Sequence, residues 1–347
     1  MFRNIYFLVF IIFLIIYGAS LLIFWQNFFK FSEKALYSRT QAIRLMNELD
    51  EVGTTGKLEQ GKPATLLFIG DIMLSRGVAN QIQKHNDYKY PFLKIAETIK
   101  SADLSFGNLE GPISARGANQ GSQYSFRADP KAVEGLKFAG FDILSVANNH
   151  IFDWGQDALL DTLSIARDNG IKTIGAGENF EKANSPVFKN ISGIKIAFLA
   201  YTNLYPESLS ASENKPGISS FDAERVKKEI AEIKNSGSAD IVIVSFHWGE
   251  EYQNRANNLQ KDIARSLIDV GADLIIGHHP HVIQEIEKYK DKWVAYSLGN
   301  FVFDQYFSEE TKTGLILKVK VQNKKIIDIE QAKIRINETF QPEIIGL

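Results

Sequence analysis

Short apolar runs alternate with longer stretches of helical spacing from Ala64 onward. Each run is four to seven residues long, which is typical of a buried strand. The runs predict strands over 65–70, 103–106, 142–146, 171–174, 186–190, 194–200, 240–246 and 273–276. The stretches between them predict helices near 74–85, 92–100, 130–139, 156–169, 221–236 and 257–270. This alternation favours an α/β sheet with crossover helices.

The pattern changes after these runs. Residues 293–297, 314–321 and 326–336 are apolar runs with few helical stretches between them, and we expect them to form antiparallel strands. No internal repeat interrupts the region from 64 to 347, which is therefore predicted to be one domain.

The N-terminal segment has a different character. No charged residue occurs between Arg3 and Lys30, and the apolar run from Ile5 to Trp25 is long enough to span a bilayer as a helix. The small residues at 18–20 lie inside this run, whereas a signal-peptide cleavage site would follow a shorter one. We therefore predict an uncleaved, single-pass membrane anchor over residues 1–30. Residues 31–63 are predicted to form a helical stalk and a linker rich in glycine and threonine.

Composition narrows the chemistry. The formal net charge of -2 does not indicate a nucleic-acid partner. The chain has no cysteine, which excludes thiolate ligands, disulfides and a cysteine nucleophile. A metal site in this chain would use nitrogen and oxygen ligands only.

Five of the six histidines follow predicted strands in three short groups. Two further strands are followed by acids. Because parallel strands bring their carboxyl ends to one edge of a sheet, these side chains are expected to gather there. The residues are His150, His247, His278, His279, His281, Asp71 and Glu110. Imidazoles and carboxylates in one place predict a metal site.

Each motif also has a plainer interpretation. Asp71 could cap the helix that begins near Leu74, and Asn108 or Asn300 could belong to ordinary turns. His150 alone could be a satisfied buried residue, although Asp153 could hold it through its other ring nitrogen.

The segment Gly-His-His-Pro-His (277–281) is the most specific motif, because three imidazoles in four residues rarely serve packing. His279 and His281 lie two residues apart and are expected to point the same way from an extended loop. His278 is expected to face elsewhere.

Taken in order, the motifs resemble the CapA/PgsA family of poly-gamma-glutamate capsule synthesis proteins, a branch of the calcineurin-like metallophosphoesterases. The matching segments are Gly-Asp-Ile-Met (70–73), Gly-Asn-Leu-Glu-Gly-Pro (107–112), Ala-Asn-Asn-His (147–150), His-Trp-Gly-Glu-Glu-Tyr (247–252), Gly-His-His-Pro-His-Val (277–282) and Ser-Leu-Gly-Asn-Phe (297–301). The resemblance covers roughly 64–304.

The resemblance implies a four-layer αββα sandwich with one or two divalent ions, of Mn, Fe, Zn or Mg, at the strand ends. It implies that Asp71 and His281 serve a first ion and that Asn149, His247 and His279 serve a second. A carboxylate between the two ions would come from the Gly-Asn-Leu-Glu segment, which contains Glu110. His150, held by Asp153, would protonate a leaving group or hold a phosphate. We also expect substrate contacts from Asn108, Asn148, His278 and Asn300.

Two departures affect the first ion. The phosphoesterase pattern has a histidine where this chain has Met73, and its bridging aspartate aligns with Asn108. The missing charge must come from Glu110 or be absent, so one ion or a weakly held pair is expected.

The resemblance also implies a function. We expect a membrane-anchored, extracytoplasmic protein for synthesis or export of poly-gamma-glutamate or another anionic envelope polymer, with a metal-dependent phosphoesterase-like site. A non-catalytic accessory subunit that binds the polymer or a capsule synthase complex is the alternative. A metal-dependent peptidase acting on gamma-glutamyl bonds ranks last, because the chain has no His-Glu-x-x-His segment.

Overall fold

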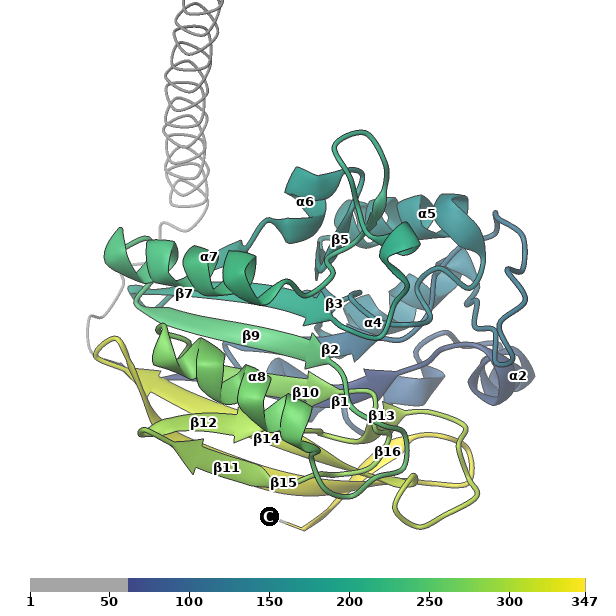
Figure 1. Cartoon of the computed structure of the whole chain (residues 1–347). Coiled ribbons are helices and arrows are strands. Elements are labelled where there is room, and N and C mark those ends of the chain that lie inside the picture. Colours follow the sequence, from purple (N-terminus) through teal and green to yellow (C-terminus); the bar gives the residue numbers. More distant parts are fainter. Residues whose placement is uncertain (1–61, 347) are drawn as a thin grey trace, which may run out of the picture. The chain divides into compact units, whose positions relative to one another are not determined.

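The computed structural model describes residues 62–346, in which two β-sheets lie face to face (Figure 1). The first sheet has eight strands in the order β16-β15-β14-β1-β2-β3-β4, with β13 also paired to β1. Its strands are β1 (Ala64–Ile72), β2 (Leu104–Leu109), β3 (Ile143–Ser145), β4 (Lys172–Ile174), β13 (Asn300–Val302), β14 (Thr313–Gln322), β15 (Lys325–Ile336) and β16 (Pro342–Gly346). Strands β1 to β4 are parallel, and β14 to β16 extend the sheet in antiparallel fashion.

The second sheet has six strands in the order β11-β12-β10-β9-β7-β6. They are β6 (Val187–Ile191), β7 (Ile194–Thr202), β9 (Ile241–His247), β10 (Leu274–His278), β11 (Ile286–Tyr289) and β12 (Lys292–Ala295). The four central strands are parallel, and β6 and β11 form antiparallel edges. A separate pair joins β5 (Ala176–Gly177) to β8 (Gly217–Ile218).

Alternating side chains explain why the two sheets pack together. In β1, Leu66 and Phe68 enter the core between the sheets, whereas Leu67 and Ile69 face the helices on the outer side. Strand residues point alternately to opposite faces, so an uninterrupted apolar strand supplies two cores at once.

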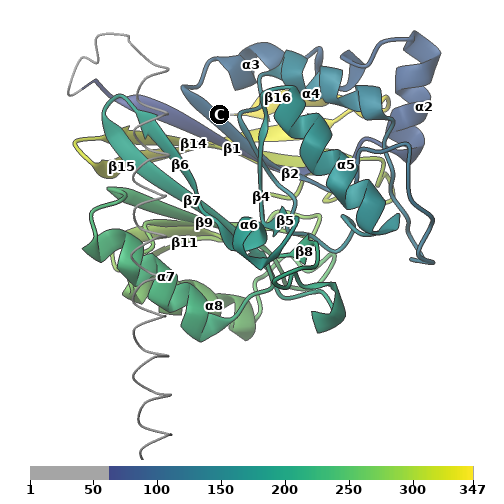
Figure 2. The ribbon, with the colours of Figure 1, turned by 90° about the horizontal axis from the view of Figure 1, so that it is seen from above.

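Helices cover the outer face of each sheet. The first sheet packs against α2 (Arg76–His85), α3 (Ala96–Lys100), α4 (Val133–Ala139) and α5 (Gly155–Asp168), and the second against α7 (Ala223–Asn235) and α8 (Asn258–Asp269). The short α6 (Phe180–Asn184) lies beside β5. Figure 2 shows α3 to α5 on one side of the sheets and α7 and α8 on the other. The layers are therefore helix, sheet, sheet and helix, as expected.

The strand predicted over 293–297 is present, but it lies in a different sheet from β14 and β15. Strand β12 belongs to the six-stranded sheet, where it runs parallel to β10 and antiparallel to β11. The tight turn at Lys290 and Asp291, both with positive φ, reverses the chain before β12 and sets this direction. The antiparallel expectation holds for β14 and β15 but is wrong for the pairing of β12 with β10.

The predicted anchor (1–30) and all but the last residues of the stalk and linker (31–63) lie outside the described residues. Within residues 62–346, no helix combines the length and apolar character needed to cross a bilayer.

Candidate metal centre

Four parallel strands end at the same place, and their registers bring the predicted residues together. Asp71 on β1 lies opposite Asn108 on β2 and Asn300 on β13. His247 on β9 lies opposite His278 on β10. The carboxyl ends of β1 and β2 in the first sheet and of β9 and β10 in the second therefore contribute to one site. Ligands commonly bind at this edge of α/β sheets.

Glycines let the backbones approach closely at this edge. A methyl group added at Gly70 would lie 1.9 Å from the Gly299 carbonyl oxygen. The Asp71 N–H donates to that same oxygen at 3.0 Å. Only hydrogen fits at position 70.

Two carboxylates and an amide form the base of the site. The Asn108 side-chain amide donates to Asp71 Oδ1 at 2.8 Å and to Glu110 Oε2 at 2.9 Å. Asp71 is 0% exposed and Glu110 is 1% exposed. Glu110 stays at this position because its N–H donates to the Ile72 carbonyl at 2.8 Å, which prolongs the pairing of β2 with β1. One neutral amide thus bridges two buried acids.

Two histidines complete what we call the buried cluster, namely Asp71, Asn108, Glu110, His278 and His281. His278 Nδ1 lies 3.3 Å from Asp71 Oδ1, and His281 Nδ1 lies 3.3 Å from Asp71 Oδ2. His281 Nε2 lies 3.6 Å from Glu110 Oε1.

The position of Asn300 determines which nitrogen of His281 is free. Asn300 donates its amide to Gln305 Oε1 at 3.0 Å and to the Thr311 carbonyl at 2.9 Å. Its oxygen is then left to accept from His281 Nδ1, at 2.9 Å. The Nε2 lone pair of His281 consequently faces Glu110 Oε1, an arrangement that a cation would stabilise.

The loop after β10 does not have the extended conformation that the sequence predicted. His279 has φ 97° and His281 has φ 57°, so the chain turns through left-handed conformations. The expectation that His278 faces elsewhere is wrong, because its imidazole contacts Asp71. The His279 N–H donates to Asp71 Oδ2 at 3.2 Å, which ties the turn to the buried cluster. Such backbone conformations in non-glycine residues are concentrated at functional sites.

The residues predicted to share a second ion also lie together. His247 Nε2 lies 2.7 Å from Asn149 Oδ1, and its ring centroid lies 4.9 Å from that of His279. Since the amide oxygen only accepts, Nε2 carries the proton in this contact. An ion held by both residues would take the place of that proton.

His150 and Asp153 form the predicted pair. His150 Nδ1 lies 2.7 Å from Asp153 Oδ2. The ring packs on Phe126, with centroids 4.1 Å apart, and the same Asp153 oxygen accepts from the Phe126 N–H at 2.8 Å. The predicted support of His150 by Asp153 is confirmed, and Nε2 is left for other partners.

The four residues expected to contact substrate lie beneath the surface. Asn108, Asn148, His278 and Asn300 are each at most 1% exposed. Asn148 donates to Asn108 Oδ1 at 3.1 Å and to the Leu109 carbonyl at 2.7 Å. The three asparagines position the acids and an imidazole through hydrogen bonds. Contact with substrate stays a prediction for all four residues.

Burial and charge set the pKa values of the two acids apart. Burial alone would raise the pKa of Asp71, but the hydrogen bonds and charges of His278 and His281 hold that pKa well below its usual range. Burial, followed by the charges of Asp71 and Glu251, raises the pKa of Glu110 well above its usual range. Two carboxyls this close cannot both ionise easily without a counter-charge.

The two imidazoles predicted to serve a second ion are held neutral. Burial, and then the charge of His279, lowers the pKa of His247 well below its usual range. Burial, and then the charge of His281, lowers the pKa of His279 to about 3. Neutral imidazole is the form that ligates a metal, so both side chains are ready for one at neutral pH.

Within residues 62–346, two groups of side chains could hold a cation. Asp71, Glu110 and His281 form one, and Glu251, His279 and His281 form the other. Buried Glu110 Oε1 and His279 Nδ1 have no hydrogen-bond partner within the described part of the chain. Buried polar atoms are normally satisfied, and these unpartnered ones face the other ligand atoms, so the donor set fits a divalent ion.

Glu251 was not among the predicted ligands. It lies four residues beyond His247 in a segment with two glutamates, so the sequence does not show which one reaches the site. Gly249, with φ 85°, turns the chain, and Glu251 then lines the pocket. The local sequence does not show where the turn at Gly249 directs the chain, so Glu251 could not be chosen from the sequence.

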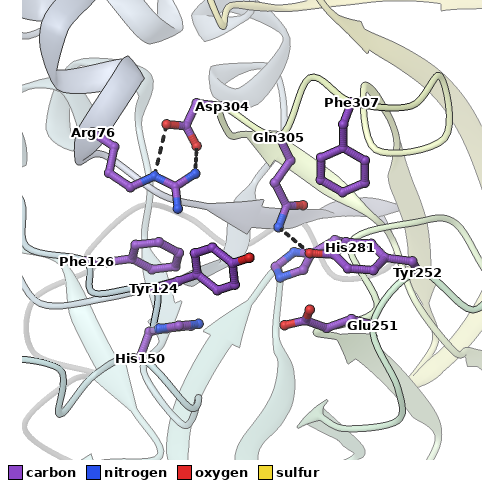
Figure 3. A pocket seen from close by; sticks show the side chains of 10 residues that line it. All are labelled: Arg76, Tyr124, Phe126, His150, Glu251, Tyr252, His281, Asp304, Gln305 and Phe307. Carbon is purple, nitrogen blue, oxygen red and sulfur yellow. Dashed lines mark hydrogen bonds and ion pairs between the residues drawn. The ribbon is translucent and has the colours of Figure 1, made fainter. Parts of the chain in front are cut away.

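A pocket opens above the buried cluster (Figure 3). His150, His281 and Glu251 line it on the side of the candidate ligands, and Arg76 and Tyr252 are among the other lining residues. Tyr124, Tyr252 and Phe307 are large and exposed around it, the last at 66%. A ligand can therefore reach the imidazoles of His150 and His281 from solvent.

The sequence matches a known family. The family model described as "Bacterial capsule synthesis protein PGA_cap" matches residues 65–305. The chain is 34% identical over 266 residues to "Capsule biosynthesis protein CapA" of Bacillus anthracis, covering 75% of this chain and 64% of that one. It is 34% identical over 252 residues to "PGA biosynthesis protein CapA" of Bacillus subtilis (strain 168), covering 72% and 66%. The match thus spans just under two thirds of the length of these relatives.

Among solved structures, a phosphatase from Mycoplasma pneumoniae aligns with a TM-score of 0.49 and 16% identity. The alignment covers 80% of this chain and 95% of that one.

Proposed function

Because the chain belongs to the bacterial capsule synthesis family PGA_cap, as its motifs predicted, we propose that it serves synthesis or export of a capsule polymer through a divalent-metal-dependent, phosphoesterase-like site. The observation that carries the metal-dependent part is Glu110. Within residues 62–346, its Oε1 is buried without a hydrogen-bond partner, and it lies 3.6 Å from His281 Nε2 and 3.9 Å from His247 Nε2. Without a cation this arrangement leaves a buried acceptor unsatisfied, which is costly.

The chain's own residues divide into three tasks. Asp71, Glu110 and His281 would hold one ion, and Glu251 and His279, with His247 and Asn149 nearby, would serve a second. A bound divalent ion would supply Lewis-acid polarisation of a phosphoryl oxygen and charge neutralisation. His150, oriented by Asp153, would donate a proton from Nε2 to a leaving oxygen.

The polymer, the partners and the location extend the proposal. One matched relative is named as a PGA biosynthesis protein, which supports an anionic polymer such as poly-gamma-glutamate. We propose that residues 1–30 anchor the protein in the cell membrane with the domain outside, where a capsule synthase complex would be its partner.

The test uses the full-length protein in detergent. Metal content after loading with Mn²⁺ or Zn²⁺ is measured together with hydrolysis of a generic phosphodiester. We expect one or two bound ions and turnover in the wild type, and loss of both in His279→Ala. His85→Ala is the matched control, because this sixth histidine stacks on Tyr90 with centroids 3.9 Å apart and lies outside the site.

The results separate the candidate functions. Bound metal without turnover of any phosphate ester tested would support the accessory alternative, in which the same pocket binds polymer. Absence of bound metal at saturating concentration would contradict the metal-dependent site itself.

A further inference from the structure

Arg76 differs from every other residue that lines the pocket. It is the one lysine or arginine among the ten lining side chains. A guanidinium stays protonated at any physiological pH, so Arg76 brings a permanent positive charge to a pocket that also contains Glu251 and Asp304.

The guanidinium is held in a fixed orientation. Its Nε donates to Asp304 Oδ2 at 3.1 Å, and its Nη2 contacts Asp304 Oδ1. Asp304 Oδ2 also accepts from the Gly77 N–H at 2.9 Å. The guanidinium carbon lies 5.0 Å from the centre of the Phe126 ring. The backbone of Arg76 has φ 50°, which non-glycine residues seldom adopt.

One edge of the guanidinium remains available. Arginine has five N–H donors, and the contact with Asp304 occupies the Nε and Nη2 edge. Figure 3 shows Asp304 on one side of Arg76, with Phe126 and Tyr124 on the other and His150 beyond Phe126. Since His150 packs on the same ring, Arg76 and the proposed proton donor border the same part of the pocket.

We propose that Arg76 binds an oxyanion of the ligand, a carboxylate or a phosphate, at a point separate from the buried cluster. A preorganised guanidinium with a free edge suits planar oxyanions, and its rigid support lowers the entropy lost on binding. The favoured ligand therefore carries two anionic groups, one for the metal centre and one for Arg76. This inference rests on the proposed function only in taking the pocket as the ligand site.

A purely structural role for Arg76 makes a different prediction. The pair with Asp304 also links the start of α2 to the segment after β13. If this link were its whole purpose, removing either partner would have the same effect. If Arg76 binds an anion, removing Arg76 weakens binding strongly, whereas removing the charge of Asp304 leaves the guanidinium able to bind.

The experiment measures binding rather than turnover. Full-length, metal-loaded protein in detergent is titrated calorimetrically with inorganic phosphate and with a short gamma-linked glutamate oligomer. Arg76→Gln should weaken binding of at least one probe by about 10- to 100-fold, since a charge-assisted hydrogen bond is lost. Asp304→Asn should change it by less than about threefold. Arg265→Gln is the control, because Arg265 pairs with Glu287 at 2.8 Å on the α8 side of the second sheet.

The two probes distinguish the source of the anion. A loss confined to the oligomer assigns a carboxylate to Arg76, and a loss confined to phosphate assigns a phosphate. Melting temperatures should fall equally in Arg76→Gln and Asp304→Asn, because both break the same pair. Arg76→Lys keeps the charge without the planar fork and should bind with intermediate affinity, which provides the test if the glutamine variant does not fold.

Two results would overturn the inference. One is wild-type affinity for both probes in Arg76→Gln, or in Arg76→Lys if the glutamine variant is unfolded. The other is equal weakening in Arg76→Gln and Asp304→Asn. If the protein turns over substrate but its ligand binding does not depend on Arg76, only this inference fails. If binding depends on Arg76 but there is no turnover, the proposed hydrolase activity fails and this inference stands.

Discussion

The buried cluster and the pocket above it belong to the same strand ends, yet they are built differently. Asp71, Asn108 and His278 lie on strands and are almost inaccessible to solvent. Arg76, His150 and Glu251 come from helix starts and loops and line a pocket open to solvent. The strands fix groups suited to an ion, whereas the loops present groups suited to a ligand. Changes in the two regions should therefore affect different measurements.

The largest effect should come from the pocket side. His150→Ala should lower turnover by about 10²- to 10⁴-fold, because a positioned proton donor is lost. Metal content should stay near that of wild type, since His150 belongs to neither candidate ligand group, whereas the melting temperature should fall because buried Asp153 loses a partner. Release of metal by this variant as readily as by His279→Ala would show that His150 is a ligand.

The next effect concerns the buried cluster. Glu110→Gln should weaken metal binding by more than about 100-fold, since even outer partners of metal ligands contribute roughly 10- to 100-fold. Without metal, the same change should raise the melting temperature, because burial and the charges of Asp71 and Glu251 disfavour an ionised Glu110. Glu309→Gln, on the exposed surface, is the control. Equal metal affinity in Glu110→Gln and wild type would remove Glu110 from the ligand set.

A smaller effect should follow from removing the side chain of Asn148, which hydrogen-bonds to Asn108 beside Asp71 and Glu110. Asn148→Ala leaves Asn108 Oδ1 and the Leu109 carbonyl without this donor, at a cost of roughly 1–3 kcal/mol in unfolding free energy. Metal affinity should fall by roughly 10- to 100-fold as Asn108 loosens. Asn190→Ala on the exposed edge of β6 is the matched control, and chemical denaturation with metal titration checks both quantities. An unchanged affinity would limit Asn148 to a role in folding.

The last prediction concerns the dependence of stability on pH. The pKa of His279 is lowered from 6.5 to about 3 by burial and then by His281, so the unfolded chain takes up the proton first as pH falls. The stability that neutral His279 contributes is present above about pH 6.5 and is lost toward pH 3. Metal-free wild type should thus lose stability relative to His279→Gln by up to about 1.4 kcal/mol per pH unit in this window. Urea unfolding of both metal-free proteins at pH 8 and pH 5 checks this. The same difference in unfolding free energy between wild type and His279→Gln at both pH values would contradict it.

The sequence predicted the buried cluster's location better than its contacts. Strands expected over 65–70 and 240–246 are β1 and β9, because long apolar runs must be buried whatever their neighbours are. Asp71 and His247 consequently stand where strand-end reasoning put them. The pairing of His150 with Asp153 was also accessible, since three residues separate them along the chain.

The rest depended on contacts that no local pattern specifies. Strand β13, with three residues, is too short to show periodicity and exists through pairing with the distant β1. Strand β16 forms an antiparallel hairpin with β15. The left-handed conformations of His279 and His281 break the alternation on which the expected direction of His278 rested, and His278 contacts Asp71. Arg76 meets Asp304 across 228 positions of sequence, so nothing near either residue could indicate the pair.

The hydrogen atom on Gly70 has a consequence for how this site tolerates mutation. Residue 70 has no acid, base or ligand atom, yet a methyl group there would collide with the Gly299 carbonyl at 1.9 Å. Relief of that collision must push β1 away from β13, and Asp71 away from Asn300, its neighbour in register. The geometry of the candidate metal centre is therefore sensitive to the smallest chiral side chain, at a position that has no reactive group of its own.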